Sequence, residues 1–477
     1  MNFEQIIGLE VHCELKTNSK MFSASPVTFG KEPNTMINEI DMAMPGILPV
    51  LNKRAVEYAI RVCHALHMDI DELLRFDRKN YYYSDLPKGF QITQEQFPIG
   101  KNGYLDIIVD GKTKRIEIER LHMEEDTAKQ FHYDSYSLID YNRSGIPLIE
   151  IVTKPSIRSG AEASAYLEKL RQVFLYTDVS DAKMEEGSMR CDINISIRPL
   201  GSQKFGTRTE IKNLNSISHV QQAIEFESLR QEKIILDGGK VLQETRRFDE
   251  KRKETVAMRI KENVANYKYY PEPNILPIRL NHQWVMDIKE RLPIMAEQRE
   301  KIYIDKYGLS QSEAHRLVSY KELSDFYEET VKNCSRYKIA CHLLLGEVLG
   351  YLNKKNISLV ETKLTPHYLS EIIEYINEEM ISSKQAKEVL ECVMTEGKKP
   401  QCIIEEKGMK QISDVDILTQ LIDQILDNNE KSIRDFSSGK DRAIGFLVGQ
   451  VMKETKGQAN PKITNQLLLK LLKERVQ

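Results

Sequence analysis

Cysteines are few in this 477-residue chain, and long apolar runs are missing. The seven cysteines are scattered and include no CxxC pair, so reduced thiols in the cytoplasm are the simplest interpretation. No apolar run approaches the ~18 residues of a membrane span, and the N-terminus lacks the basic and apolar regions of a signal peptide. We therefore expect a cytoplasmic protein with no membrane partner.

A phosphate-binding P-loop is also missing. Residues 201–207 have two glycines at its spacing but lack the lysine that should follow the second glycine, so a hairpin turn is the better interpretation. Any ATP bound here would need arginine, lysine and metal to hold its phosphates. The net charge of −3 argues neither for nor against a polyanionic partner.

The pattern of predicted secondary structure changes near residue 293. Before it the chain is β-rich, with a hairpin predicted at Asp110-Gly111 between 104–109 and 114–122, and helices predicted at 53–67 and 161–175. After it, amphipathic helices follow one another at 293–307, 310–318, 321–333, 338–355, 365–378, 383–395 and 414–428. Thr365-Pro366 and Ser382-Ser383 are typical helix starts. We predict an α+β protein with three domains, residues 1–292, 293–408 and 409–477.

Acidic and imidazole side chains alternate with apolar ones around Glu10 and His12. In a strand, Leu9 and Val11 point one way while Glu10 and His12 point the other. An isolated segment of this kind would favour the solvated face of an edge strand. Glu150 weakens that interpretation because it interrupts an apolar strand face, and a buried carboxylate needs a partner such as a cation.

Similar groups recur in other segments. They are Arg120–Asp126, with three consecutive acids at its end, and Asp192–Arg198, in which polar residues alternate with isoleucines. Each alone suits a solvated surface as well as a pocket. If these segments share one sheet, they make an oxygen-rich, histidine-containing pocket suited to Mg²⁺ and a nucleoside triphosphate.

Two further stretches leave two interpretations open. Residues 76–85 combine cations with three consecutive tyrosines. They fit either a strand with a ladder of tyrosines, or a loop that binds an anion and stacks a base or ring. In the tail, residues 431–477 hold ten Lys/Arg and four Asp/Glu. An apolar helix there joins a basic turn and a second helix, which fits binding to a phosphate backbone or a solvated charged face.

Taken together, these segments resemble the GatB family, the B subunits of the tRNA-dependent amidotransferase GatCAB. The resemblance runs in order along essentially the whole chain. Its motifs are IIGLEVHCELKTNSKMFS, MPGILPVLNKRAV, FDRKNYYYSDLPKGFQIT, RLHMEEDTAK, DYNRSGIPLIEIV, KMEEGSMRCDINIS, EIKNLNS, QETRRFD and GFLVGQVMKETKGQANP.

The resemblance implies an ATP-dependent, glutamine-hydrolysing carbon–nitrogen ligase. Such proteins phosphorylate the side-chain carboxylate of Glu-tRNA(Gln) or Asp-tRNA(Asn), and ammonia from a GatA-like glutaminase subunit then forms the amide. A GatC-like small subunit completes the heterotrimer. The implied architecture is a cradle-like catalytic domain (1–292), a helical domain (293–408) and a YqeY-like tRNA-binding tail (409–477).

The family's functional residues carry over to positions in this sequence. The resemblance implies His12, Glu125 and Glu150 as Mg²⁺ ligands, Glu10, Glu124 and Asp192 as catalytic groups, Lys79 and Arg190 at ATP, and Lys453, Lys456, Asn460 and Lys462 at tRNA.

Two departures from the family stand out. Many relatives carry four zinc-binding cysteines where this chain has Ser23, Ser25, Asn38 and Asp41, so no zinc is expected. The chain also has Ser84 where relatives often have proline, so the rigidity of that loop is lost.

Two competing classes of protein remain to be weighed. A self-contained amide ligase would need its own ammonia source, yet no Cys–His or Ser–Lys glutaminase constellation is evident. The basic tail would also have no function in such an enzyme. A non-catalytic tRNA adaptor would leave the acidic cluster unexplained. ATP hydrolysis with and without misacylated tRNA separates the classes.

Overall fold

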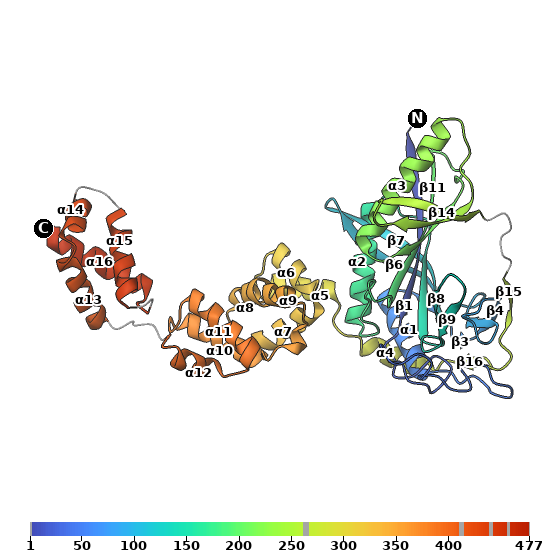
Figure 1. The fold of residues 1–477 in the computed structure, drawn as a ribbon, viewed down its shortest axis with the longest axis horizontal. Coiled ribbons are helices and arrows are strands. Elements are labelled where there is room, and N and C mark those ends of the chain that lie inside the picture. The colour runs from blue at the N-terminus through green and yellow to red at the C-terminus, as the bar shows by residue number, and fades with distance from the viewer. Residues whose placement is uncertain (1, 261–266, 410–414, 438–441, 456–457, 477) are drawn as a thin grey trace. The chain divides into compact units, whose positions relative to one another are not determined.

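A computed structural model of the chain describes residues 2–260, 267–409, 415–437, 442–455 and 458–476 (Figure 1). Contacts divide the chain into two compact units, 1–296 and 297–477. The first combines a large sheet with helices, and in the second every described element is a helix, so the α+β prediction is confirmed. The predicted boundary at 408/409 adjoins residues 410–414, which lie outside the described residues, so the three-domain division stays a prediction.

The first unit is built around one large sheet. Among the described residues it has nine strands in the order β14-β13-β12-β11-β1-β10-β7-β6-β2. The strands are β1 (Phe3–Glu14), β2 (Asp69–Ile70), β6 (Gly100–Val109), β7 (Lys112–Glu125), β10 (Pro147–Thr153), β11 (Met189–Pro199), β12 (Thr209–Leu214), β13 (Glu244–Asp249) and β14 (Glu254–Ile260). Neighbouring strands are antiparallel except β12 and β13, which run parallel.

Local sequence explains the β6–β7 hairpin. Asp110 and Gly111 have φ values of 51° and 73°. Two consecutive left-handed residues are what a two-residue type I′ turn requires, and Asp-Gly accepts them at low cost. The predicted hairpin is confirmed, with both strands longer than the sequence suggested.

Short strands form smaller sheets. They are β15 (Lys268–Pro271), β4 (Asp77–Asn80) and β5 (Phe90–Thr93) in one sheet, β16 (Ile278–Arg279) with β3 (Leu73–Leu74), and β8 (Lys129–His132) with β9 (Ser137–Asp140). Only the first half of the 76–85 stretch is therefore strand, and its three tyrosines follow in irregular chain.

Helices cover one face of the large sheet (Figure 1). They are α1 (Lys53–Ala65), α2 (Gly160–Tyr176) and α3 (Ile217–Leu236), followed by α4 (His282–Glu290), which contacts α1. Leu9, Val11 and Ile193 lie in the core with Leu167 of α2 and Ile224 of α3. Because strand side chains alternate, the polar residues between these core residues lie on the opposite face of the sheet. We call it the open face because these helices do not cover it, although β5 packs against β7.

The second unit begins with α5 and continues through a series of helices. They are α5 (Ala296–Asp305), α6 (Gln311–Val318), α7 (Lys321–Val331), α8 (Tyr337–Leu343), the π-helical turn η1 (Leu344–Val348), α9 (Leu349–Lys355), the 3₁₀ turn η2 (Leu359–Glu361), α10 (Pro366–Asn377), α11 (Ser383–Glu396), α12 (Pro400–Glu406), α13 (Val415–Asp427), α14 (Glu430–Ser437), α15 (Arg442–Glu454) and α16 (Pro461–Val476). Each predicted helical segment of this half contains helix among its described residues, and residue 414 lies outside them. The side chains of Thr365 and Ser382 cap α10 and α11 as predicted.

The last helices form a cluster with its own apolar core. Leu418 and Ile422 of α13 pack with Leu447 of α15 and Leu468 of α16. In the part of the chain that the structure describes, no helix has both the length and the apolar character needed to cross a membrane.

Candidate functional site

Three neighbouring strands place histidines and carboxylates in a row on the open face of the sheet. His12 of β1 is the Cα partner of Glu150 on β10, and Glu150 is the partner of His122 on β7. One oxygen of Glu150 lies 3.2 Å from Nε2 of His12 and 3.2 Å from Nε2 of His122. The two oxygens of Glu124 lie 3.7 Å and 3.6 Å from the same two nitrogens.

Electrostatics within this cluster perturb the pKa of both histidines and of Glu150. Burial alone would lower the pKa of His12 and His122, but Glu150 and Glu124 outweigh burial and raise each pKa to about 9. Burial alone would raise the pKa of Glu150, but His122 and His12 outweigh it and hold that pKa well below its ordinary value. The cluster therefore favours an ionised carboxylate between two cationic rings.

The same cluster offers the donor set of a divalent cation site. One ligand atom each from His12, Glu124 and Glu150 lie within 4.8 Å of one another. Carboxylates with one imidazole suit a hard or borderline divalent ion such as Mg²⁺ or Mn²⁺, whose ligands on opposite sides are about 4 Å apart. Nδ1 of His122 is buried without a hydrogen-bond partner, so this ring has donor or acceptor capacity to spare. The residues present fit a metal.

Glu125, the third predicted metal ligand, is engaged elsewhere. Nζ of Lys88 lies 2.5 Å from both carboxylate oxygens of Glu125, and the Ile92 amide donates to one of them over 3.0 Å. The structure thus brings His12 and Glu150 together with Glu124 rather than with Glu125. A ligand role for Glu125 stays a prediction.

A pocket of about 600 Å³ adjoins the cluster. It is lined by His12, Arg190, Cys191, Asp192, Lys212, Asn213, Leu214 and Asn215. Arg190 is the Cα partner of His12, and its guanidinium donates to Asp126 over 2.7 Å. Glu10 is the Cα partner of Asp192 and accepts a hydrogen bond from the Asn194 amide over 2.7 Å. Glu10, Asp192 and Arg190 are therefore gathered near His12, as the sequence suggested.

Lys212 is a pocket residue that the sequence analysis did not single out. Its Nζ lies 2.5 Å from Asp192 and 3.2 Å from Glu210. The β11–β12 register shifts here, and Asn213 adopts a left-handed φ of 63°. A bulge of this kind turns side chains out of the regular alternation, often beside functional sites. The alternating charges of Glu210-Ile211-Lys212 were the available signal.

Lys79, a predicted ATP-binding residue, does not line this pocket. It lies on β4, where its Nζ is 4.8 Å from the ring centroid of Tyr267 and 5.6 Å from that of Tyr81. Its ammonium thus has an aromatic environment on a separate small sheet. Its predicted role stays a prediction.

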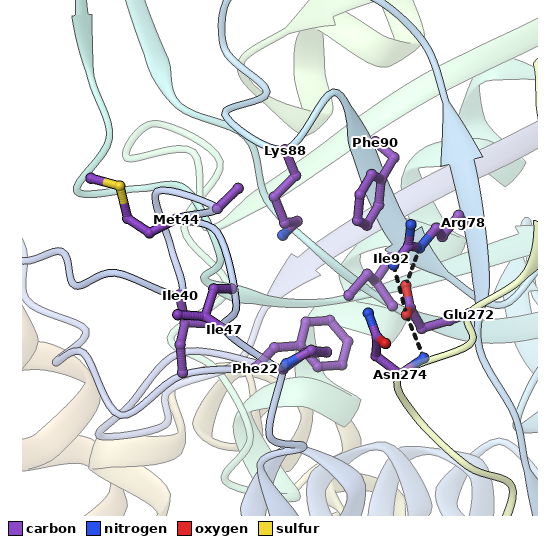
Figure 2. Close-up of a pocket in the computed structure, with 12 residues that line it drawn as sticks. Phe22, Ile40, Met44, Ile47, Arg78, Lys88, Phe90, Ile92, Glu272 and Asn274 are labelled. Carbon is purple, nitrogen blue, oxygen red and sulfur yellow. Dashed lines mark hydrogen bonds and ion pairs between the residues drawn. The ribbon is translucent and has the colours of Figure 1, made fainter.

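Figure 2 shows a second, smaller pocket of about 150 Å³. Apolar side chains of the loop before α1, including Ile40, Met44 and Ile47, form one wall. Arg78 donates two hydrogen bonds to Glu272, over 2.6 and 3.1 Å, on the other side. The polar groups of this pocket are thus largely satisfied by one another.

Two of the positions of the family's zinc cysteines bond to a third, Asp41. Asp41 accepts hydrogen bonds from the Ser23 hydroxyl over 2.7 Å and from the backbone N–H of Asn38 over 3.1 Å. The fully buried Lys20 ammonium lies 3.3 Å from the same carboxylate. With Ser25, this set offers no thiolate or imidazole, so it does not fit zinc, which favours Cys and His ligands.

The predicted tRNA-binding residues of the tail differ in their surroundings. Lys453 is exposed on α15, whereas Lys456 lies outside the described residues. Asn460 is buried, accepts hydrogen bonds from two backbone amides at the start of α16 and donates to Glu379 over 2.8 Å. Lys462 is exposed and lies 3.5 Å from Glu379. Asn460 therefore has a structural function as a helix cap.

Comparison with known proteins gives matches along nearly the whole chain. The GatB/GatE catalytic domain matches residues 5–286, and the GatB domain matches residues 325–472. The chain is 52% identical over 475 residues to the B subunit of the aspartyl/glutamyl-tRNA(Asn/Gln) amidotransferase of Staphylococcus saprophyticus, covering all of both chains. The same identity and coverage hold for the B subunits of Staphylococcus aureus strains RF122 and JH9.

Proposed function

The chain belongs to the GatB family of amidotransferase subunits, and on that premise we propose that the open face of its sheet activates a carboxylate on misacylated tRNA. The substrates are Glu-tRNA(Gln), Asp-tRNA(Asn) or both. The observation that carries the proposal is the His12–Glu124–Glu150 cluster beside a pocket lined by Arg190 and Lys212. Phosphoryl transfer depends on positioning and charge stabilisation, and this arrangement offers both.

The reaction has two steps. A carboxylate oxygen of the aminoacyl side chain attacks the γ-phosphorus of ATP, and ADP leaves. Ammonia then attacks the carbonyl carbon of the acyl phosphate, inorganic phosphate leaves with the bridging oxygen, and the nitrogen loses a proton to give the amide. An enclosed site is needed between the steps because water would hydrolyse the acyl phosphate.

His12, Glu124 and Glu150 would hold Mg²⁺, which supplies charge neutralisation at the phosphates. Arg190 and Lys212 line the pocket as cations for the phosphate oxygens, and their carboxylate partners Asp126 and Asp192 hold them in place. Asp192 lines the pocket, and Glu10, its Cα partner on β1, would orient polar groups beside it.

The proposed partners follow from the chemistry. Ammonia comes from a GatA-like glutaminase subunit, with a GatC-like small subunit in the same assembly, and the basic helical tail holds the body of the tRNA. The relatives are named as B subunits, which supports a multi-subunit enzyme. All seven cysteines are free, which supports a reducing, cytoplasmic setting.

Phosphate release by the assembled complex tests the proposal. With ATP, Mg²⁺ and glutamine, release should require misacylated tRNA and should be lost in Glu150→Ala, while glutamine hydrolysis is at least partly retained. Phosphate release that is indifferent to the aminoacyl group would instead indicate a self-contained ATPase or ligase. No release under any condition would indicate a tRNA adaptor.

A further inference from the structure

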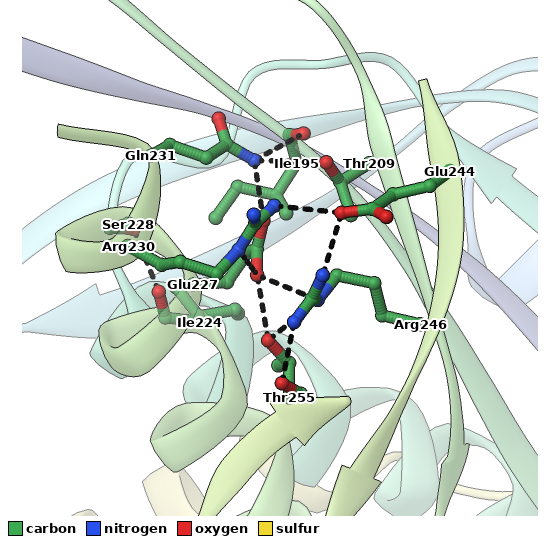
Figure 3. Close-up of polar contacts among 10 residues, drawn as sticks. All are labelled: Ile195, Thr209, Ile224, Glu227, Ser228, Arg230, Gln231, Glu244, Arg246 and Thr255. Carbon is green, nitrogen blue, oxygen red and sulfur yellow. Dashed lines mark hydrogen bonds and ion pairs between the residues drawn. The ribbon is translucent and has the colours of Figure 1, made fainter. Parts of the chain in front are cut away.

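A buried ionic network lies between α3 and the strands β12, β13 and β14, on the helix-covered face of the sheet (Figure 3). At its centre, the fully buried Glu227 of α3 accepts two hydrogen bonds from Arg230, over 2.9 and 2.7 Å, and one from Thr255 over 2.8 Å. Arg246 of β13 lies 3.4 Å from Glu227 and donates to Glu244 over 2.6 Å. Every charge in this network thus has a partner.

This network helps to fix the register of β13 against β12. The parallel pairing of β12 and β13 comprises only three residue pairs, Glu210–Thr245, Ile211–Arg246 and Lys212–Arg247. Burying ions costs free energy and adds little net stability, but it can specify one alignment among several. With Glu244 and Arg246 locked on one face, the residue between them is fixed on the other.

That residue is Thr245, and it begins a chain of contacts on the open face. Its hydroxyl donates to Oε2 of Glu210 over 2.9 Å. The other oxygen of Glu210 lies 3.2 Å from Nζ of Lys212, and Nζ lies 2.5 Å from Asp192. Thr245 is itself buried, at 4% exposure, while the Lys212 side chain is 39% exposed in the pocket. The chain therefore runs from the buried network to the pocket cation.

We propose that Thr245 is a positioning residue for Lys212, and that it acts through Glu210 to hold the ammonium where the phosphates of ATP bind. The inference rests on the proposed function, because the proposed function is what assigns the pocket to ATP. Lysine is a flexible point charge, so its usefulness in binding phosphate depends on what restrains it. Without the Thr245 hydroxyl, Oε2 of Glu210 loses this restraint and can join the other oxygen in competing with phosphate for Lys212.

The test is ATP binding by the assembled complex, measured by calorimetry, together with the KM for ATP and kcat. Thr245→Val removes the hydroxyl at constant shape, and the loss should weaken ATP binding and raise the KM about tenfold, with a much smaller change in kcat. Thr245→Ser keeps a hydroxyl and should restore wild-type values. Thr245→Ala is a second variant without the hydroxyl and should behave as Thr245→Val does.

Thr209→Val is the matched control. It removes a buried hydroxyl from β12 on the opposite face, where Thr209 accepts from Gln231 over 3.2 Å. It should lower thermal stability without changing ATP affinity. Wild-type ATP affinity in both Thr245→Val and Thr245→Ala would overturn the inference, as would an equal loss in Thr209→Val. Failure of the wild-type complex to bind ATP would instead remove the proposed function itself.

Discussion

Replacing Glu150 with glutamine should lower the pKa of both histidines in the cluster. In the wild type, one oxygen of Glu150 is 3.2 Å from Nε2 of His12 and 3.2 Å from Nε2 of His122. Once this charge is removed, burial, which already opposes protonation of both rings, is countered chiefly by Glu124. We expect each pKa to fall from about 9 to the ordinary 6.5 or below. A fall of about 2.5 units corresponds to roughly 3 kcal/mol per ring.

The same substitution should destabilise the protein in a pH-dependent way. The folded-state pKa values of the histidines lie above the unfolded value of 6.5, so their stabilising effect is fully present below pH 6.5 and is lost as the pH rises through about 9. Two rings at roughly 3 kcal/mol each set an upper limit of about 6 kcal/mol, and glutamine does not carry the burial cost of the Glu150 charge. Glu150→Gln should therefore cost about 3–5 kcal/mol at pH 6, the range for breaking a buried ion pair, and much less at pH 10.

Both effects are measurable in metal-free protein kept in EDTA. Histidine ring signals in selectively labelled protein report the two pKa values, with assignment from His12→Gln and His122→Gln, and thermal unfolding reports stability. Glu57→Gln is a control, because Glu57 pairs with Arg54 and Arg61, whose charge does not change in this range. Ring pKa values that stay near 9 in Glu150→Gln, or equal destabilisation at pH 6 and pH 10, would refute the electrostatic reasoning.

The remaining predictions concern metals and the tail. Mn²⁺ binding should tighten between pH 6.5 and 9, because His12 must lose its proton to bind, and Glu124→Gln should weaken it about tenfold or more. Glu125→Gln should weaken Mn²⁺ binding much less. If an electron paramagnetic resonance titration showed the larger loss for Glu125→Gln, Glu125 rather than Glu124 would be the metal ligand. Metal analysis of the purified protein should find no stoichiometric zinc, and one tightly held zinc in the segment around Asp41 would contradict that. Truncation after residue 408 should weaken tRNA binding and flatten its salt dependence while sparing ATP binding, because the tail carries an excess of cations. If the truncated complex bound tRNA as tightly as the full-length complex at matched salt, the residues that recognise tRNA would lie in the rest of the chain.

Local patterns predicted much of the fold. Alternation predicted β1, Asp110-Gly111 predicted the β6–β7 hairpin, and helix caps predicted the starts of α10 and α11. Helix α3 went unpredicted for a physical reason. Its buried face includes Glu227 and Gln231, so its apolar stripe is interrupted by groups that only the tertiary network satisfies.

The sequence predicted which residues of one strand share a face, but not which strands lie side by side at the candidate site. Alternation placed Glu10 and His12 on one face. No local pattern gives the order of the strands, in which β11 lies between β1 and β12 and brings Lys212 near these two residues. Glu124 was a different case. It shares its side of β7 with His122 and alternates with the buried Met123, so the strand period already favoured it over Glu125.

Transfer of oxygen from substrate to phosphate tests the central claim most directly. Glu-tRNA(Gln) carrying ¹⁸O in its side-chain carboxylate would be incubated with the assembled complex, ATP, Mg²⁺ and glutamine, and the released phosphate analysed by mass spectrometry. Because the carboxylate oxygen attacks the γ-phosphorus and leaves with phosphate, one ¹⁸O should appear in phosphate for each amide formed. Glu150→Ala should show none, although the glutaminase partner still hydrolyses glutamine. Amide formation by the wild-type complex with no ¹⁸O in the phosphate would contradict carboxylate phosphorylation at this site.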